Sequence, residues 1–237
     1  MSRWLTGLCI ALFCCSVASA QEGATLTGKV NFEGDAPKRN KIKMEAEPAC
    51  EAKHGEAGML KQDVIVNENK TLSNVVIFVS KGAAKSEAPK DPVAITQEGC
   101  VYSPHVVCLV LGQKLVYKNG DALTHNVHGL PKMNNEFNFG QNTQGQENSV
   151  DLGTLETAIK VKCDVHPWMN MWVHVFENAF FAITGADGTY SIKGLPAGEY
   201  EVKAWHEKSK TGWTQTVKVG DKESKEVNWT VKAEELK

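Results

Sequence analysis

Short strand patterns separated by turn signals run through nearly the whole chain after Gln21, and they limit the fold more than any other feature. In TLTGKVNF, the apolar residues Leu26, Val30 and Phe32 fall on one face. NVVIFV (74–79) is the continuous apolar run expected of a strand buried on both faces. Many short strands with turns between them are typical of β-sandwiches. We therefore predict an all-β protein.

Three blocks of strand patterns follow one another along the chain. The first block, residues 21–92, has two strand patterns that flank a polar, irregular stretch over 34–62 with room for a short helix around 44–56. It ends in SKGAAKSEAPKDP (80–92), whose small residues, charges and prolines are typical of a boundary.

The second block, residues 93–177, and the third, residues 178–237, are also built from strand patterns. In the second block, the strand pattern GQKLVYKN is followed by a turn and then by an Asn- and Gln-rich stretch over 131–150, which we predict to be a long loop. In the third block, Asp187-Gly188 is a strong hairpin signal between two strand patterns. This block is typical of an antiparallel sandwich.

The N-terminal segment MSRWLTGLCIALFCCSVASA (1–20) has the features of a secretory signal peptide. A charged start precedes an apolar run, which ends in Ala18-Ser19-Ala20, and we expect cleavage before Gln21. The apolar run is too short for a permanent membrane-spanning helix, and nothing later in the chain looks transmembrane. The sequence therefore predicts a periplasmic or secreted protein that is soluble after export.

Composition is that of a folded globular protein and gives no sign of a nucleic-acid partner. The chain of 237 residues is 42% hydrophobic and 23% charged, with a formal net charge of -2. It has no basic stripe of the kind that binds nucleic acid. Repeats of fixed period are also absent.

Four cysteines remain after the signal peptide: Cys50, Cys100, Cys108 and Cys163. An oxidising compartment favours disulfides, so two bridges are one possibility, with a connectivity that sequence alone does not fix. If Cys163 binds a metal, at most one intramolecular pair is left, and we choose Cys50 with Cys100. Cys108 lies in the apolar run VVCLVL and is expected to be a buried thiol.

The residues with metal-binding chemistry cluster in KVKCDVHPWMNMW (160–172), between two strand patterns. Cys163, His166 and Met169 offer a thiolate, an imidazole and a thioether, which suit copper far better than calcium or magnesium. Two His and one Cys with a weak axial Met form the blue-copper electron-transfer arrangement. His125, just past a strand end in THNVH, is the natural source of the second imidazole.

These motifs resemble those of the cupredoxins, the amicyanin- and plastocyanin-like blue copper proteins. CDVHPWM is similar to the C-x-x-H-P-F-M ligand loop of amicyanin, and THNVHG is similar to its P-H-N-V-H-F stretch. GQKLVYKN and YSPHVVCLVLG resemble further cupredoxin strands, so the likeness covers about residues 93–177. The resemblance implies a Greek-key β-sandwich that binds one type 1 copper ion.

The resemblance implies a role for each motif residue. His125 and His166 would be the imidazole ligands, Cys163 the thiolate and Met169 the weak axial ligand. His166 would face solvent through an apolar patch. Asn126 would lie just outside the ligand set, and its neighbourhood would donate hydrogen bonds to the Cys163 sulfur.

Several other residues have alternative interpretations. Met171 lies five residues after His166, the spacing of plastocyanin-like loops, and is the alternative axial ligand. His128 is expected to be structural or close to the metal centre, with a ligand role as the alternative. His174 is expected at the surface or at an interface. His54 and His105 are single histidines for which we expect no metal role.

The third block carries a second resemblance. AITGADGTYSIKGLPAGEYEVKAW resembles a carboxypeptidase-regulatory-like (transthyretin-like) β-sandwich, and TGKVNF and NVVIFV resemble the earlier strands of that fold. Because these two strands precede the copper block and the D-G-x-Y signature follows it, we predict a cupredoxin inserted into one sandwich made of residues near 24–90 and 178–237. The alternative is a longer N-terminal cupredoxin followed by a separate small sandwich.

Together these features predict a one-electron carrier rather than an enzyme. The resemblance implies c-type cytochromes or a periplasmic dehydrogenase as redox partners, with the electron passing through His166. One alternative is a copper-binding or delivery protein that uses the same ligands. A redox enzyme is disfavoured because no three-His cluster appears. A metal-free adhesion or sugar-binding module, with Cys163 in a disulfide, is the remaining alternative.

Overall fold

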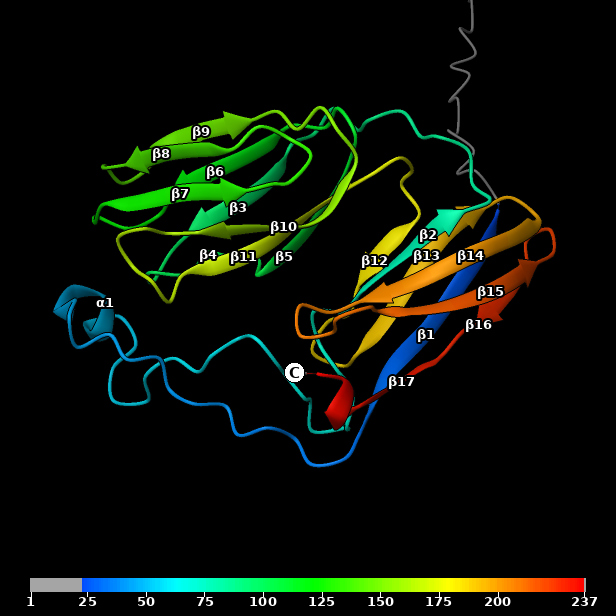
Figure 1. Cartoon of the computed structure of the whole chain (residues 1–237), viewed down its shortest axis with the longest axis horizontal. Helices are drawn as coiled ribbons and strands as arrows, with labels where there is room; N and C mark the ends of the chain where they lie inside the picture. Colours follow the sequence, from blue (N-terminus) through cyan, green and yellow to red (C-terminus); the bar gives the residue numbers. More distant parts are fainter. Residues whose placement is uncertain (1–22, 237) are drawn as a thin grey trace, which may run out of the picture.

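The computed structural model describes residues 23–236, and these form two β-sandwiches that lie side by side (Figure 1). The signal peptide predicted for residues 1–20 lies outside the described residues. We call the two units the host sandwich and the inserted sandwich, because the strands of the second lie between two strands of the first in the chain. The all-β fold class predicted from the sequence is confirmed.

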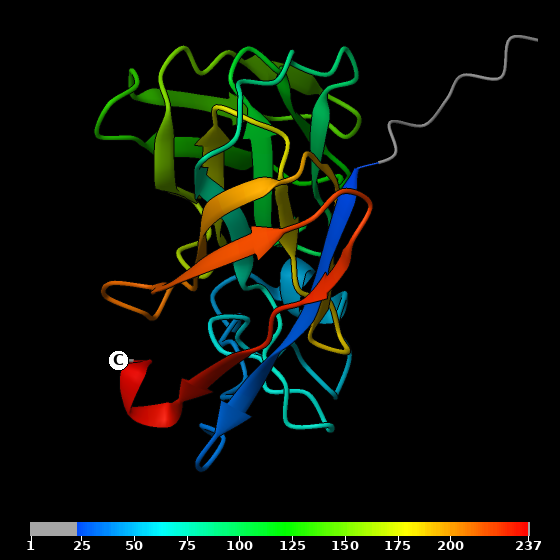
Figure 2. The same ribbon diagram turned by 90° about the vertical axis from the view of Figure 1, so that its right-hand side faces the viewer.

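The host sandwich is built from both ends of the chain. One sheet has the order β13-β1-β16, with β17 also pairing with β1, and the other has the order β12-β2-β14-β15. β1 runs antiparallel to β13 but parallel to β16 and β17, so this unit is not purely antiparallel (Figure 2). Its strands are β1 (Ala24–Glu33), β2 (Val76–Lys81), β12 (Phe181–Ile183), β13 (Thr189–Leu195), β14 (Gly198–Trp205), β15 (Trp213–Val219), β16 (Ser224–Glu226) and β17 (Trp229–Lys232), followed by the 3-10 helix η1 (Ala233–Glu235).

The inserted sandwich also has two sheets, of order β5-β11-β10-β7-β8 and β4-β3-β6-β9. β2 and β12, which precede and follow this unit in the chain, pair with each other in the host sandwich. The unit therefore leaves and rejoins the host sandwich at neighbouring strands. Its strands are β3 (Val93–Gln97), β4 (Tyr102–Ser103), β5 (Val106–Val110), β6 (Leu115–Asn119), β7 (His125–Leu130), β8 (Phe137–Gln141), β9 (Glu147–Val150), β10 (Glu156–Lys162) and β11 (Asn170–Phe176).

The stretch 131–150 is not the long loop that we predicted. It contains β8 and β9, which pair with β7 and β6. In β8, Phe137 and Phe139 pack against the core, and the alternating positions Asn138 and Gly140 are exposed. Two aromatic residues at strand spacing were therefore the signal, and the surrounding Asn and Gln residues obscured it.

The segment 34–62 leaves the end of β1 and passes beneath one end of the inserted sandwich before the chain returns to β2 (Figure 1). We call it the cap segment. It contains one short helix, α1 (Pro48–Ala52), inside the range where the sequence left room for a helix. Burial of Cys50 on this helix, rather than helical propensity over five residues, holds the segment in place.

The two sandwiches have separate cores and share an apolar interface. On β11, Val173 and Val175 face the core of the inserted sandwich, whereas Phe176 on the other face packs against the host sandwich. Phe176 stacks on Phe78 with ring centroids 4.5 Å apart. β11 is therefore buried on both faces. This explains why apolar and aromatic side chains predominate on both of them.

His174 and Cys108 belong to this interface. The ring of His174 lies edge-on to Trp205 with centroids 4.3 Å apart, and the residue is fully buried. This is the interface position that we gave as one of two expectations. Cys108 is a buried free thiol in the same cluster.

Within residues 23–236, no helix has the length and apolar character needed to cross a membrane.

The buried ring of His174 predicts a loss of stability in mild acid. Burial lowers its pKa from 6.5 to about 3, so between these values the unfolded chain binds a proton that the folded chain does not. Stability should fall as the pH drops from 6.5 towards 3, by up to about 1.4 kcal/mol per pH unit from this residue. His206, whose pKa burial lowers to about 4, acts in the same direction.

Urea unfolding from pH 7 to pH 4 measures this effect. We expect His174→Gln to reduce the dependence of the unfolding free energy on pH, whatever its effect at pH 7. An unchanged slope would show that His174 is not held neutral in the folded protein.

Candidate metal centre

The loop between β10 and β11 is closed by backbone hydrogen bonds that bring its ligand residues together. Cys163 N–H donates to the carbonyl of Met169 at 3.1 Å, and Met169 N–H donates to the carbonyl of His166 at 2.9 Å. Pro167 follows His166 and restricts the backbone at the turn. The short hairpin therefore brings Cys163 and His166 close together through its own backbone hydrogen bonds.

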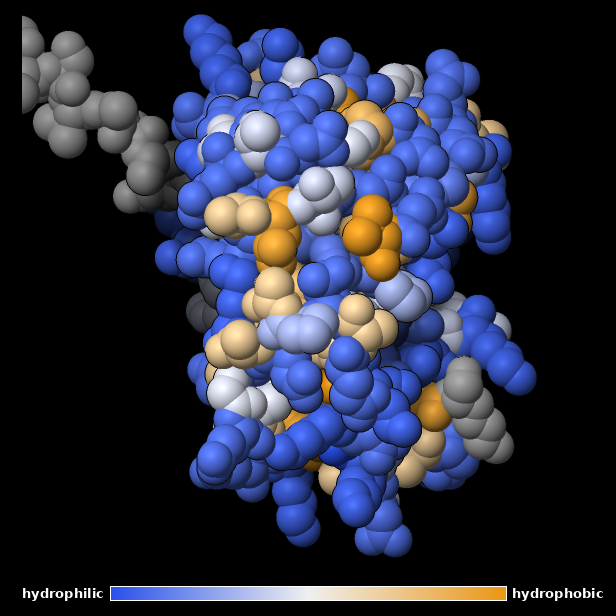
Figure 3. Space-filling view, turned by 90° about the vertical axis from the view of Figure 1, so that its left-hand side faces the viewer, coloured by the Kyte–Doolittle hydropathy of each residue, from blue (hydrophilic) through white to orange (hydrophobic). Residues whose placement is uncertain are grey.

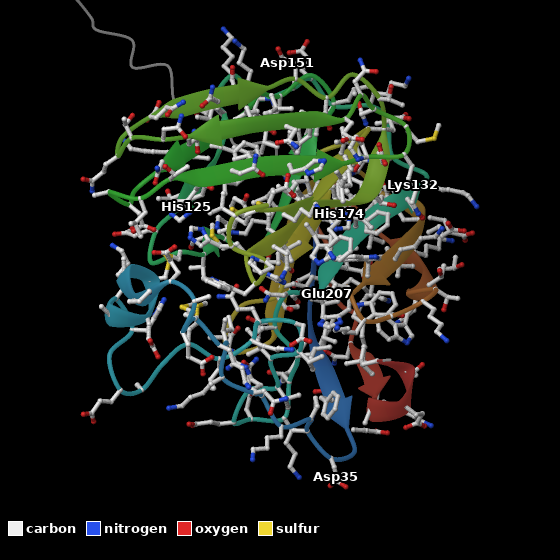
Figure 4. The ribbon with its side chains drawn as sticks, turned by 60° about the vertical axis from the view of Figure 1, so that its left-hand side comes forward. Asp35, His125, Lys132, Asp151, His174 and Glu207 are labelled. Atoms are coloured by element: carbon white, nitrogen blue, oxygen red, sulfur yellow. A yellow bond between two sulfur atoms is a disulfide. The ribbon has the colours of Figure 1, made fainter. Side chains whose placement is uncertain are left out.

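Strand pairing supplies the second imidazole. β7 runs antiparallel to β10, and its register places His128 opposite Lys162. The start of β7, at His125, therefore lies beside the loop that begins at Cys163. Figure 4 shows His125 at the end of the inserted sandwich that faces the cap segment.

Three donor atoms converge at this point. His125 Nδ1 lies 3.1 Å from His166 Nδ1, and Cys163 Sγ lies 3.8 Å from the same nitrogen. All three atoms lie within 4.8 Å of one another, and all three residues are buried. Two ligands that share one metal at about 2.0–2.3 Å, at angles near 109–120°, lie about 3.3–3.7 Å apart. The observed separations are close to this range, so the residues fit a metal ion bound between them.

The Cys163 sulfur accepts two backbone hydrogen bonds. The N–H groups of Asn126 and His166 each point to Sγ at 3.4 Å. The Asn126 side chain also accepts a hydrogen bond from Asp164 N–H at 3.1 Å, which ties the start of the ligand loop to β7. Such donors stabilise a thiolate and hold it in one orientation.

Asp121 orients His125 and was not recognised from the sequence. Its carboxylate lies 2.8 Å from His125 Nε2, so Nε2 carries the proton and Nδ1 is free to face the site. It also accepts the N–H groups of Gly99 and Cys100 and pairs with Lys53 at 2.9 Å. Burial alone would raise its pKa, but these four partners outweigh burial and hold the pKa at about 2.

Both candidate axial methionines are buried in the core of the inserted sandwich. Met169 lies inside the hydrogen-bonded loop, whereas Met171 belongs to β11, opposite Val161 of β10. The loop position favours Met169, and this assignment stays a prediction.

The remaining histidines have partners of their own. His128 has both ring nitrogens occupied, Nδ1 by Asp164 at 2.8 Å and Nε2 by Glu136 at 2.9 Å. His54 Nε2 lies 2.7 Å from the carbonyl of Gly99, and His105 pairs with Glu207. The structure therefore does not bring these three residues into the ligand cluster.

The expectation that His166 faces solvent is wrong. Only 2% of its surface is exposed, because the cap segment covers the ligand loop. Cys50 of α1 lies against the ring, with Sγ 3.6 Å from His166 Nε2. Burial, and next the neighbouring His125, lower the pKa of His166. The irregular polar sequence of 34–62 gave no sign that it would cover the site.

Three interactions fasten the cap segment beside the metal centre. Cys50 and Cys100 form a disulfide, Lys53 pairs with Asp121, and His54 hydrogen-bonds Gly99. Figure 3 views the molecule from this side and shows apolar side chains gathered across the middle of the face, between hydrophilic ones above and below.

A cleft of about 900 Å³ opens beside the ligand loop. Trp168 lines it, and the ring of this residue lies 5.2 Å from that of His166. The cleft lies between the cap segment, the ligand loop and the host sandwich. Five lysines line it: Lys41, Lys43, Lys61, Lys160 and Lys208.

Comparisons with known proteins find similar solved structures only. No family profile and no curated protein matches this chain. Amicyanin from Paracoccus versutus is 24% identical, with 42% of this chain and 97% of amicyanin covered and a TM-score of 0.33. A purple cupredoxin from Nitrosopumilus maritimus is 20% identical, with 35% and 99% covered and a TM-score of 0.31.

A copper-containing nitrite reductase from Thermus scotoductus SA-01 is 19% identical, covers 42% of this chain and has a TM-score of 0.32. This chain spans only 25% of the length of that enzyme. The solved structures named here are thus cupredoxins and one larger copper protein.

Because the Asp121 carboxylate orients His125, we expect it to strengthen copper binding. Asp121→Asn keeps the shape of the side chain but removes the charge that orients the imidazole. We expect copper affinity to fall by about 10–100-fold, measured by competition with a chelator of known affinity. Asp151→Asn, at an exposed position away from the site, is the matched control (Figure 4). Equal affinities for the two variants would contradict this role for Asp121.

Proposed function

We propose that this chain is an exported type 1 copper protein that carries one electron at a time between redox partners. The observation that carries the proposal is the convergence of His125 Nδ1, His166 Nδ1 and Cys163 Sγ in a buried site. A thiolate with two imidazoles suits copper, and a nearby thioether completes the blue-copper set. Met169 is our choice for that thioether.

A bound copper ion would supply the one-electron couple, and the residues of the chain would keep the site unchanged while its charge changes. Backbone hydrogen bonds hold Cys163, and Asp121 holds His125. The cap segment excludes water from His166. A rigid, dry site needs little rearrangement when one electron is gained or lost, which favours rapid transfer.

The covered His166 changes the expected route for the electron. Trp168 lies beside His166 and reaches the cleft, so it is the aromatic side chain through which we propose that partners exchange electrons. Asp63 pairs with Lys208 at the cleft, and the other four lysines would attract an acidic surface. By analogy with the family that the sequence resembles, we propose c-type cytochromes or a periplasmic dehydrogenase as partners, bound through a small transient contact.

Copper delivery is the second candidate function. It is favoured by the Cys50–Cys100 pair, which places two further sulfur atoms beside His166. We propose electron transfer ahead of delivery because three interactions close the cap segment over the site, and a closed site favours retention of an ion. In both cases we propose that the chain acts without catalysing a reaction.

The proposed copper–thiolate bond predicts a visible absorption band. Loading of the reduced mature protein with one equivalent of Cu(I), followed by oxidation, should give an intense blue band, and Cys163→Ser should abolish it. Cys108→Ser is the matched control, because this buried thiol lies at the interface of the sandwiches and should leave the band intact. A colourless wild-type protein would contradict the type 1 assignment.

The position of Met169 in the loop predicts that it tunes the site. Met169→Leu should shift both the reduction potential and the visible spectrum, whereas Met171→Leu should leave them close to wild type. Protein-film voltammetry of both variants tests this directly. The opposite result would identify Met171 as the axial ligand.

A further inference from the structure

We propose that Cys50 and Cys100, when reduced, form a second copper site together with Nε2 of His166, and that Cu(I) reaches the buried centre through it. This inference goes beyond the proposed electron-carrier function and assigns a role to the cap segment. It rests on soft-metal chemistry at this end of the inserted sandwich and does not require a blue copper spectrum.

The imidazole of His166 already faces the disulfide, whose two sulfurs would separate on reduction to admit an ion. Sγ of Cys50, Sγ of Cys100 and a ring nitrogen of His166 all lie within 4.8 Å of one another. The 3.6 Å between Cys50 Sγ and His166 Nε2 falls in the range of about 3.5–3.7 Å for a sulfur and a nitrogen that share one metal. All three residues are buried, so the site would be shielded from water.

Two thiolates and one imidazole define the ion. Soft thiolate ligands select Cu(I), Zn and iron–sulfur clusters, and three ligands leave Zn one short of its usual four. We therefore assign the site to Cu(I).

A continuous series of donors joins this outer site to the inner one. Cys100 also lies within 4.8 Å of Asp121 and His125, and His166 belongs to both the outer and the inner ligand groups. His166 presents Nε2 to Cys50 and Nδ1 to His125 and Cys163. An ion could therefore exchange outer thiolates for inner ligands one at a time without entering bulk water.

The disulfide would close this route. An external dithiol reduces the Cys50–Cys100 disulfide by giving it two electrons and two protons, and the dithiol itself becomes a disulfide. Binding of Cu(I) to the two thiols of the protein then releases their two protons. Oxidation by an external disulfide returns the bond, and the external partner leaves as a dithiol. In the disulfide form the sulfurs no longer offer thiolates, and the cap segment covers His166.

The test uses the full mature chain carrying Cys163→Ser, which removes the inner thiolate and isolates the outer site. The protein is reduced with a phosphine, freed of reductant without oxygen, and titrated with Cu(I) against a chromogenic Cu(I) chelator. We expect one tightly bound Cu(I), with a thiolate-to-Cu(I) absorption in the near ultraviolet. The oxidised form of the same variant should bind at least 10-fold more weakly.

Two further variants in this background identify the ligands. Addition of Cys50→Ser or Cys100→Ser should abolish the near-ultraviolet band, and the matched control Cys108→Ser should retain it. Circular dichroism of each protein verifies the fold. Equal Cu(I) binding by the reduced and oxidised forms, or a band that survives loss of Cys50, would overturn the outer site.

The outcome is separable from that for the proposed function. Wild-type protein that is reduced to open the disulfide, loaded with Cu(I) and then oxidised tests the inner centre by its blue Cu(II) band, and the Cys163→Ser background tests the outer site alone. Loss of one signal with retention of the other assigns the failure to a single site.

Discussion

The carboxylate of Asp121 connects parts of the chain that are far apart in sequence, and the geometry of the metal centre depends on it. It fixes the proton on His125 Nε2, accepts the backbone N–H groups of Gly99 and Cys100, and pairs with Lys53 of the cap segment. Because the group is almost fully buried, loss of any one partner would leave charge poorly compensated. Ligand orientation, disulfide position and closure of the cap are therefore linked through one side chain.

The host sandwich stabilises the same centre from another direction. β11 begins just after the ligand loop, packs its inner face into the inserted core and buries its outer face against the host sandwich. β11 therefore has little freedom to move, and the end of the ligand loop is fixed with it. This arrangement explains why a strand next to the ligand residues is apolar on both faces, whereas a strand of an isolated sandwich would show polar residues on one side.

The sequence was sufficient for the local features of the molecule. Cys163, His166 and Met169 lie on one short hairpin, so their spacing alone indicated soft-metal chemistry, and alternation predicted most of the strands. The pairing of β1 with strands from the end of the chain could be inferred only through resemblance, because strand partners distant in sequence leave no periodic signal. β8 was missed because two phenylalanines were outnumbered by polar residues.

The parts that could not be predicted depend on contacts over long sequence separations. Asp121 precedes His125 by four residues in a turn, where an Asp is common for reasons of backbone conformation alone. Likewise, the cap segment lacks periodicity, and its position is set by the disulfide, by two polar contacts and by a few scattered apolar residues, Ile42, Met44 and Met59, that pack against the inserted core. Exposure of His166 was assumed from a resemblance that covers the inserted sandwich but not the segment that covers the site.

The closed cap imposes two opposing requirements on a copper site of this kind. In the proposed site, exclusion of water and the four predicted ligands would favour a rigid centre, but an ion would have to enter during assembly and electrons would have to reach the centre afterwards. The geometry separates these needs in space: Cys50 lies against Nε2 of His166, and Trp168 lies beside the same ring and lines the open cleft. Trp168 also donates its indole N–H to the carbonyl of Cys100. This hydrogen bond links the aromatic side chain at the cleft to the disulfide that closes the cap. Any rearrangement of Cys100 would therefore act on both of the proposed routes, the one for the ion and the one for the electron.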